Sequence, residues 1–231
     1  MQVKVGWDSK VSDQFPNLVV GVGLIYGVCI EENNQQLRLL KKTVYEEVDG
    51  RFEIDRLKED LTVRAYRDFY WRLDIDPTKT RPSGEALLRR VLHGEELPNI
   101  STAVDAYNLA SMKTIIPISG FDIDKIAPPF QVRFAEENEK FTGIGMKTPI
   151  PLKTNMLVLA DEKQVLCIYP YRDCDHTKIT LKTQNVVLVG YGVAGTTSSQ
   201  VKEAVEMALT FISEVAGGKK ESTNVFRSGH E

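Results

Sequence analysis

A glycine-rich stretch, NVVLVGYGVAGTTSSQVKEAV at residues 185–205, constrains the fold more than any other segment. Gly190, Gly192 and Gly195 form a G-x-G-x-x-G motif between a β-branched run and a helical pattern, as in a dinucleotide-binding turn. That unit needs a second strand with an acidic residue about 20 residues further on. Position 214 still lies in the helical pattern, and the polar residues after it leave no room for a buried strand. We therefore expect no nicotinamide, flavin or other cofactor.

Two other uses remain for these glycines. One is a tight turn leading into a helix that is capped by one of residues 196–199. The other is an anion site, because free N–H groups and the helix dipole at such a turn attract phosphate or carboxylate.

Composition excludes several classes of protein. The chain has 231 residues, 42% hydrophobic, with a net charge of -3, which is ordinary for one large or two small globular domains. We find no apolar run long enough for a bilayer and no signal-peptide pattern at the start. Three unpaired cysteines indicate reduced thiols and a cytoplasmic protein. The mild acidity argues against a non-specific DNA binder, and we expect neither a DNA nor a membrane partner.

The order of sequence patterns predicts the fold class. A β-rich run at 18–30 precedes helical spacing at 36–48, at 55–73 with a break near Asp60, at 83–94 after an N-cap at Ser83, and at 99–114. Several β-rich segments and a last helix follow. We expect an α/β fold of the mixed α+β type, with partly antiparallel sheets covered by helices.

The densest polar cluster is YRDCDHTK at residues 171–178, directly after an apolar strand. It is either a polar hairpin loop or a strand-end site at which Arg172 and Asp173 present a charged fork to a ligand. No second Cys/His pair exists for zinc, so we expect no metal. His176 is too close in sequence to Cys174 to act easily as its base, and the histidines support no catalytic triad.

The segment 56–90 is rich in Lys and Arg, with aromatic residues interleaved. It forms either amphipathic helices with solvated arginines or a nucleic-acid face that combines phosphate contacts with stacking. Composition does not separate these alternatives.

Two stretches, 72–126 and 142–189, resemble the tRNA-binding and editing module of the phenylalanyl-tRNA synthetase β subunit, and more closely the freestanding proteins that consist of that module. The motifs that carry the resemblance are Arg81-Pro82-Ser83, Asn99-Ile100, Val104-Asp105 with Asn108, and Pro117 through Phe121-Asp122. The resemblance implies an α/β module with a pocket that hydrolyses tyrosine wrongly esterified to phenylalanine tRNA. Nothing resembles the aminoacylation core.

The sequence departs from the bacterial synthetase pattern at two positions. Ser119 stands where the family has His in a P-L-H-A-F-D run, and Val189 stands where Glu ends a T-x-N-V-L-L-E run. Losing a charged group that recognises a hydroxyl alters selectivity, because buried polar pairing discriminates between ligands. The resemblance therefore implies that the pocket edits another amino acid or no longer edits.

These considerations give one expected function and one alternative. We expect a trans-acting aminoacyl-tRNA editing hydrolase that binds charged or mischarged tRNA; the alternative is a non-catalytic module that binds tRNA or an amino-acid-like small molecule. The expected domain spans 1–217, with 1–60 as its less defined N-terminal part, and 218–231 form a flexible tail. The expected site residues are Ser119 and Asn108 for catalysis, Asp122, Arg172, Asp173, Thr177, Gly192 and Gly195 for substrate, and Arg81 and Arg89 for tRNA phosphate.

Overall fold

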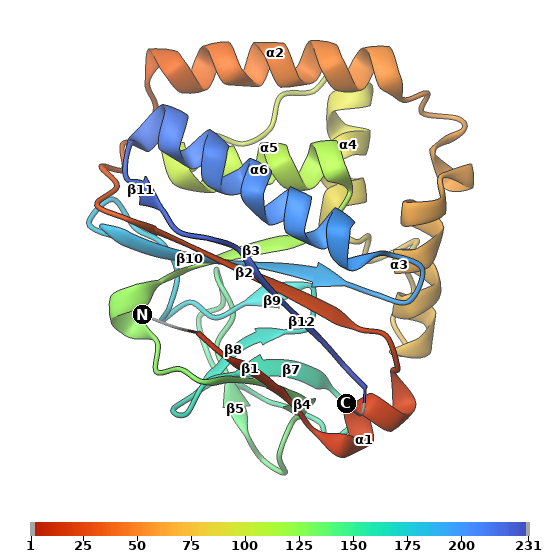
Figure 1. Cartoon of the computed structure of the whole chain (residues 1–231). Coiled ribbons are helices and arrows are strands. Elements are labelled where there is room, and N and C mark those ends of the chain that lie inside the picture. Colours follow the sequence, from red (N-terminus) through yellow and green to blue (C-terminus); the bar gives the residue numbers. More distant parts are fainter. Residues whose placement is uncertain (1–2, 230–231) are drawn as a thin grey trace.

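A computed structural model describes residues 3–229 and shows two stacked sheets with helices on one side (Figure 1). The central sheet has the order β11-β2-β10-β3, and β12 also pairs with β2; all its pairs are antiparallel. Its strands are β2 (Val19–Tyr26), β3 (Ile118–Asp122), β10 (Asn185–Gly192), β11 (Lys219–Lys220) and β12 (Asn224–Arg227). The mixed α/β fold class predicted from the sequence is confirmed.

The lower sheet has the order β1-β4-β7-β8-β9, in which only β1 and β4 run parallel. Its strands are β1 (Val5–Trp7), β4 (Phe130–Phe134), β7 (Leu157–Ala160), β8 (Val165–Ile168) and β9 (Arg172–Asp173). A separate hairpin joins β5 (Lys140–Phe141) to β6 (Ile150–Pro151). The space between the two sheets holds much of the hydrophobic core.

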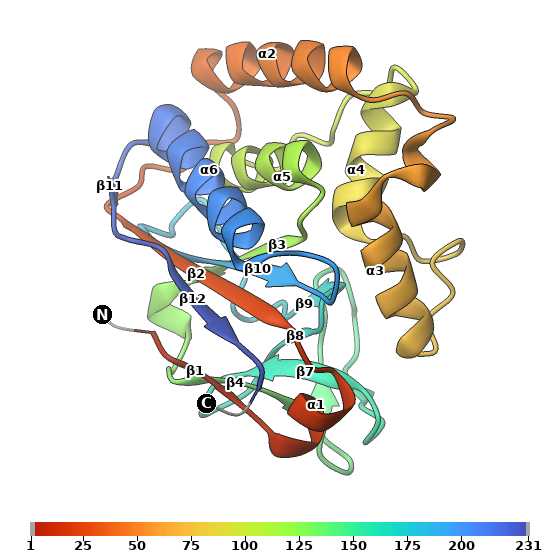
Figure 2. The ribbon, with the colours of Figure 1, turned by 45° about the vertical axis from the view of Figure 1, so that its right-hand side comes forward.

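Except for α1, which packs beside the lower sheet, and the short η2, the helices lie on the other face of the central sheet (Figure 1). Figure 2 shows α5 and α6 against this sheet, α2 above them, and α3 and α4 to one side. Their bounds are α1 (Ser9–Gln14), α2 (Gln35–Arg51), η1 (Leu57–Glu59), α3 (Leu61–Arg72), α4 (Ser83–Leu92), α5 (Thr102–Thr114), η2 (Ile123–Lys125) and α6 (Ser198–Ala216). No helix within residues 3–229 is long and apolar enough to cross a membrane.

Helix boundaries follow the capping residues. Asp60 caps α3 by accepting from the N–H groups of Thr62 and Val63, and this explains the break in the helical pattern. Ser101 caps α5 by accepting from the N–H of Val104. Ser83 is the first residue of α4 rather than its cap, because Pro82 holds the extended cap position.

The glycine motif is divided between a strand and a turn. Gly190 and Gly192 lie inside β10 and face α6, where a Cβ on Gly192 would come within 2.6 Å of Val201. The expectation that they form the turn is therefore wrong: they let α6 pack closely on the sheet. Gly195 lies in the turn itself, with φ of +99°. Of the four candidate caps at 196–199, Thr197 is the one used, and it forms a capping box with Gln200.

The C-terminal segment is not a flexible tail across its described part. Strands β11 and β12 pair with β2 and extend the central sheet. The hydroxyl of Ser228 accepts from the N–H of Leu18 at 2.8 Å and donates to the carbonyl of Phe15 at 3.1 Å. The prediction fails because the edge of β2 needs partners for its backbone groups. Residues 230–231 lie outside the described part.

Candidate functional site

The predicted catalytic residue Ser119 is the second residue of β3, the strand at one edge of the central sheet. Side chains alternate along a strand, so Ser119 and Gly120 face opposite sides. The Ser119 side chain points away from the helices and donates a hydrogen bond to Oδ1 of Asp173 on β9, with an oxygen–oxygen distance of 2.6 Å. This bond joins the central sheet to the lower sheet at a buried position.

Asp173 is held in place by the pairing of β9 with β8, where it lies opposite Cys167. Loss of solvent around the carboxyl group raises the pKa of Asp173 to about 6, although the Ser119 hydrogen bond and the charge of Arg172 oppose the rise. A carboxyl group with this pKa exchanges protons close to neutral pH, which suits a general base or acid.

A phenol from α5, that of Tyr107, approaches β3 from the helix side, over Gly120, and is close enough to feel the charge of Asp173. Gly120 makes this possible, because a Cβ there would lie 2.8 Å from the Tyr107 ring. Burial and the charges of Asp173 and Asp105 raise the pKa of Tyr107, so its phenol stays protonated and remains a donor.

Tyr191 and Cys167 complete the group. The Tyr191 hydroxyl lies 3.2 Å from Sγ of Cys167, and the Tyr191 ring packs edge-on against Tyr169 with centroids 4.8 Å apart. Burial raises the pKa of Tyr191 and of Cys167, and this keeps the thiol protonated and unreactive. We call Tyr107, Ser119, Cys167, Asp173 and Tyr191 the Ser119 cluster.

The other residues expected near Ser119 have more varied positions. Asn108 follows Tyr107 on α5 and is half-buried. Thr177 is fully buried, and its hydroxyl has no partner among residues 3–229. Arg172 is exposed and donates to the carbonyl of Ile144 at 3.4 Å. It neighbours Asp173 on a strand, so the two side chains point to opposite sides and do not form a fork.

Asp122 organises a loop and takes no part in the Ser119 cluster. Its carboxylate accepts from the Thr183 hydroxyl at 2.8 Å and from the N–H of Asp124 at 3.2 Å, and it pairs with Lys125 at 3.5 Å. It is three residues from Ser119 along β3 and therefore faces the opposite side of the strand. The structure gives Asp122 a structural role here.

The structure does not bring Gly192 and Gly195, which were expected to bind substrate, to the side of the sheet that carries Ser119. Val189 pairs with Ser119 and shares its face, so Gly190 and Gly192 face the helices on the other side. A Cβ on Gly195 would lie 3.0 Å from Ala65 of α3. Both glycines serve the packing of helices.

The two arginines expected at tRNA phosphate differ in their surroundings. Arg81 is exposed in the loop before α4. Arg89 donates from Nε to the fully buried Glu85 at 2.6 Å, and Arg67 donates to the same carboxylate through two nitrogens at 2.9 and 2.5 Å. The charge of Arg89 is therefore largely compensated within the fold, and Arg81 is the freer of the two.

Sequence reasoning missed Tyr107, Cys167 and Tyr191. If the strand alternation is continued past Gly190, Tyr191 falls on the same face as Val187 and Val189. The interpretation of the glycines as a turn hid this signal. Tyr107 gave no local signal, because it resembles any buried position of α5. Within residues 3–229 no group of three or more His, Cys, Asp and Glu side chains is placed to hold a metal ion.

Comparison with known proteins identifies one family. Residues 65–217 match the family described as the B3/4 domain, which is more than half of the chain. The phenylalanine–tRNA ligase β subunit of Haemophilus ducreyi is 28% identical over 144 residues, which cover 52% of this chain and 18% of that subunit. The corresponding subunit of Francisella tularensis is 31% identical, with the same coverage. The chain thus matches only about a fifth of these relatives.

Among solved structures, an N-terminal fragment of the phenylalanyl-tRNA synthetase β subunit from Pyrococcus horikoshii is similar, with a TM-score of 0.53 and 19% identity. The alignment covers 95% of this chain and 50% of that one. At this identity the likeness shows a shared fold.

Proposed function

The chain belongs to the B3/4 domain family, and from this premise we propose that it binds aminoacylated tRNA and hydrolyses the ester of a wrongly attached amino acid. The names of its relatives support the tRNA part of this proposal, since they are β subunits of phenylalanine–tRNA ligases. The observation that carries the hydrolytic part is the bond between Ser119 and Asp173, whose carboxyl group has a pKa of about 6.

The proposed chemistry needs few groups. A water molecule held by Ser119 attacks the ester carbonyl carbon, and the Asp173 carboxylate accepts its proton. The protonated phenol of Tyr107 is a donor for the oxyanion that develops. The bond to the ribose oxygen then breaks, and Asp173 returns the proton to that oxygen. Arg81 contributes to holding the tRNA by a phosphate contact.

A binding module without catalysis is the second candidate. It is favoured by the environment of Asp173, which no Lys or Arg side chain within residues 3–229 contacts at salt-bridge distance. A half-buried carboxylate without a bonded cation is complementary to the ammonium group of an amino acid. Bound in this way, an amino-acid-like small molecule or a charged tRNA would be retained rather than hydrolysed.

A deacylation assay separates the two candidates. Purified protein is incubated with a panel of correctly and wrongly charged tRNAs, including phenylalanine tRNA carrying tyrosine, and ester loss is followed against buffer. We expect selective hydrolysis that Ser119→Ala and Asp173→Asn each slow by about a hundredfold. The control is Asp49→Asn, a change of the same chemistry at an exposed position of α2. Hydrolysis unaffected by both site variants would overturn the mechanism, and binding without hydrolysis would establish the second candidate.

A further inference from the structure

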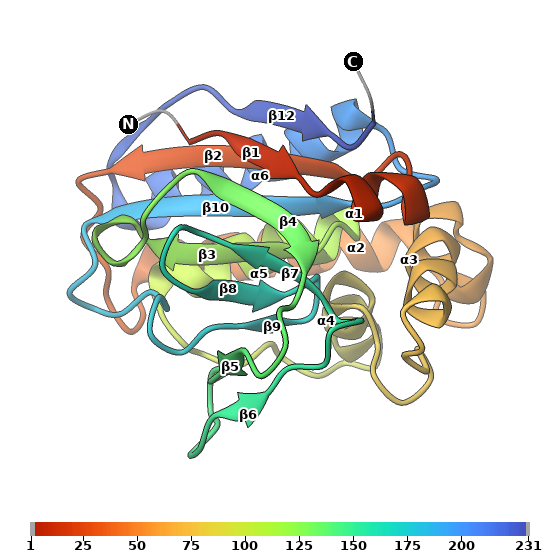
Figure 3. The same ribbon diagram turned by 90° about the horizontal axis from the view of Figure 1, so that it is seen from below.

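A groove of about 990 Å³ lies away from the Ser119 cluster, at the opposite edge of the two sheets. Its walls come from β1, the edge strand of the lower sheet, and β12, which lies on the β2 edge of the central sheet. Seen from below, β1 and β12 run along the same side of the molecule (Figure 3). The groove is therefore the open edge of the sandwich.

Both walls present unpaired backbone groups. Ser228 donates its N–H to the carbonyl of Leu18. Backbone groups alternate along an antiparallel strand, so Asn224 and Phe226 also bond to β2. The N–H and C=O groups of Val225 and Arg227 therefore point away from the sheet. On β1, Lys4 and Asp8 bond to β4, and the backbone groups of Val5 and Trp7 point to the free edge. The four outward-facing residues all line the groove.

The spacing of the sheets suits one more extended chain. Stacked sheets lie about 10 Å apart, and paired strands lie about 4.8 Å apart. A single strand placed between the two edges can therefore reach hydrogen-bonding distance of either wall. Exposed edges of this kind are sites at which another chain adds as a strand.

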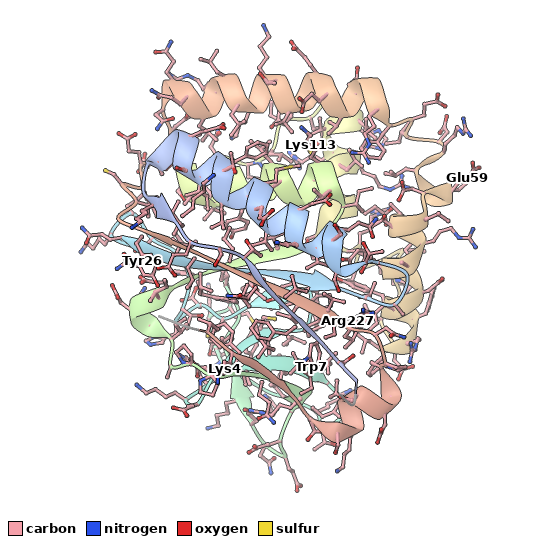
Figure 4. The ribbon with its side chains drawn as sticks, in the orientation of Figure 1. Lys4, Trp7, Tyr26, Glu59, Lys113 and Arg227 are labelled. Carbon is pink, nitrogen blue, oxygen red and sulfur yellow. The ribbon has the colours of Figure 1, made fainter. Side chains whose placement is uncertain are left out.

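The side chains in the groove specify the chemistry of the occupant. Val5, Trp7 and Phe226 form apolar surface, and the indole N–H of Trp7 is shielded from solvent without a partner among residues 3–229. Arg227 lies in the groove wall, and none of the ion pairs in the described part of the chain includes it. Figure 4 shows Trp7 and Arg227 on this side of the molecule. An apolar residue beside a carboxylate complements these groups.

We propose that this groove binds an extended peptide segment of a partner protein, which adds as a strand between β1 and β12. The segment carries apolar side chains at alternate positions and an acidic residue that pairs with Arg227. Backbone hydrogen bonds to Val225 and Arg227, or to Val5 and Trp7, supply affinity that depends little on sequence.

Selection from a library of displayed random peptides of about eight residues tests this proposal. The intact protein is the bait, and the recovered peptides are then synthesised and measured by fluorescence anisotropy. We expect alternating apolar residues with at least one Glu or Asp. Val225→Pro removes an outward N–H that an edge strand can lose, so it leaves the sheet intact and weakens binding by roughly tenfold. Arg227→Ala weakens the binding of the acidic peptides, and Leu39→Ala on α2, the control, leaves the affinity for all peptides unchanged.

Circular dichroism and thermal unfolding confirm that each variant is folded, and Trp7→Phe provides a second test that leaves the backbone untouched. Failure to recover any peptide whose binding depends on Val225, Trp7 or Arg227 would overturn the proposal. A protein dimer that Val225→Pro dissociates would instead place a second copy of this chain in the groove, and that result also overturns the assignment to a partner peptide.

Discussion

Ser119 of β3 and Val189 of β10 lie directly opposite each other in the central sheet. Opposite residues of an antiparallel pair have Cβ atoms about 4.5–5.5 Å apart and share one face of the sheet. These are the two positions at which the sequence departs from the bacterial synthetase pattern. Both departures therefore change neighbouring positions on the face of the central sheet that lies against the lower sheet. The carboxylate that contacts Ser119 comes from Asp173 of the lower sheet.

Replacing Val189 by Glu tests how this spot tolerates a second carboxylate. Val189 is fully buried, so Val189→Glu places a charge without a cationic partner close to Ser119 and Asp173. Burial and the like charge raise the pKa of the new carboxyl group, so its destabilising effect appears as the pH rises through that pKa. We expect the free energy of unfolding at about pH 8 to lie about 1–3 kcal/mol below that of Val189→Gln.

The measurement is urea unfolding of both variants at about pH 8 and about pH 5. Val189→Gln has the same shape without the charge and is the matched control. The difference between the variants should shrink at the lower pH, where the carboxyl group binds a proton. Equal stability at the higher pH would show that water or a cation reaches the new side chain.

The raised pKa of Asp173 predicts a pH-dependent stability. The folded protein binds this proton up to about pH 6, whereas the unfolded chain releases it near the ordinary value of 3.8. Stability from this group is therefore complete below the lower value and is lost as the pH rises through the higher one. We expect the advantage of the wild type over Asp173→Asn in unfolding free energy to fall by roughly 2–3 kcal/mol across that window. Parallel curves of unfolding free energy against pH would contradict the raised pKa.

Much of this architecture was predictable because periodicity and caps are local. The helical spacing at 99–114 placed α5, and the break near Asp60 placed the start of α3. Ser119 came from the family resemblance, not from periodicity. Its partner Asp173 was expected in the same site, but their direct bond depends on how β9 packs under β3, which no local pattern reveals.

The errors share a physical cause in long-range packing. The sequence places the strand end at Val189 because glycines usually mark turns, yet α6 requires Gly190 and Gly192 inside β10. The segments 219–220 and 224–227 are short and carry little strand pattern of their own, and they form strands because β2 offers an edge to pair with. Arg89 was expected to contact phosphate, but it is paired with the buried Glu85. The carboxylate of Glu85 joins Arg67 of α3 to Arg89 of α4, and this contact depends on the packing of the two helices.

Two glycine substitutions of the same kind should have opposite effects. Gly192→Ala places a Cβ 2.6 Å from Val201 and 2.9 Å from Val19, so α6 must shift, and we expect a loss of about 1–3 kcal/mol in unfolding free energy. Gly50→Ala enters open space near the end of α2, where alanine favours the helix by about 0.5–1 kcal/mol. Urea unfolding measures both. A stable Gly192→Ala protein that loses ligand binding would restore this glycine to the binding site.

Ser228 tests the contribution of the C-terminal strand. Its hydroxyl joins Leu18 and Phe15, more than 200 residues away along the chain, and all three side chains are buried. Ser228→Ala leaves the N–H of Leu18 without this partner, and we expect unfolding free energy to fall by about 1–3 kcal/mol. Ser199→Ala is the control, because its hydroxyl bonds to Glu203 on the exposed start of α6 and its loss should change stability by less than about 0.5 kcal/mol. Equal urea midpoints for the two variants would show that the hydrogen bonds of the Ser228 hydroxyl add no measurable stability.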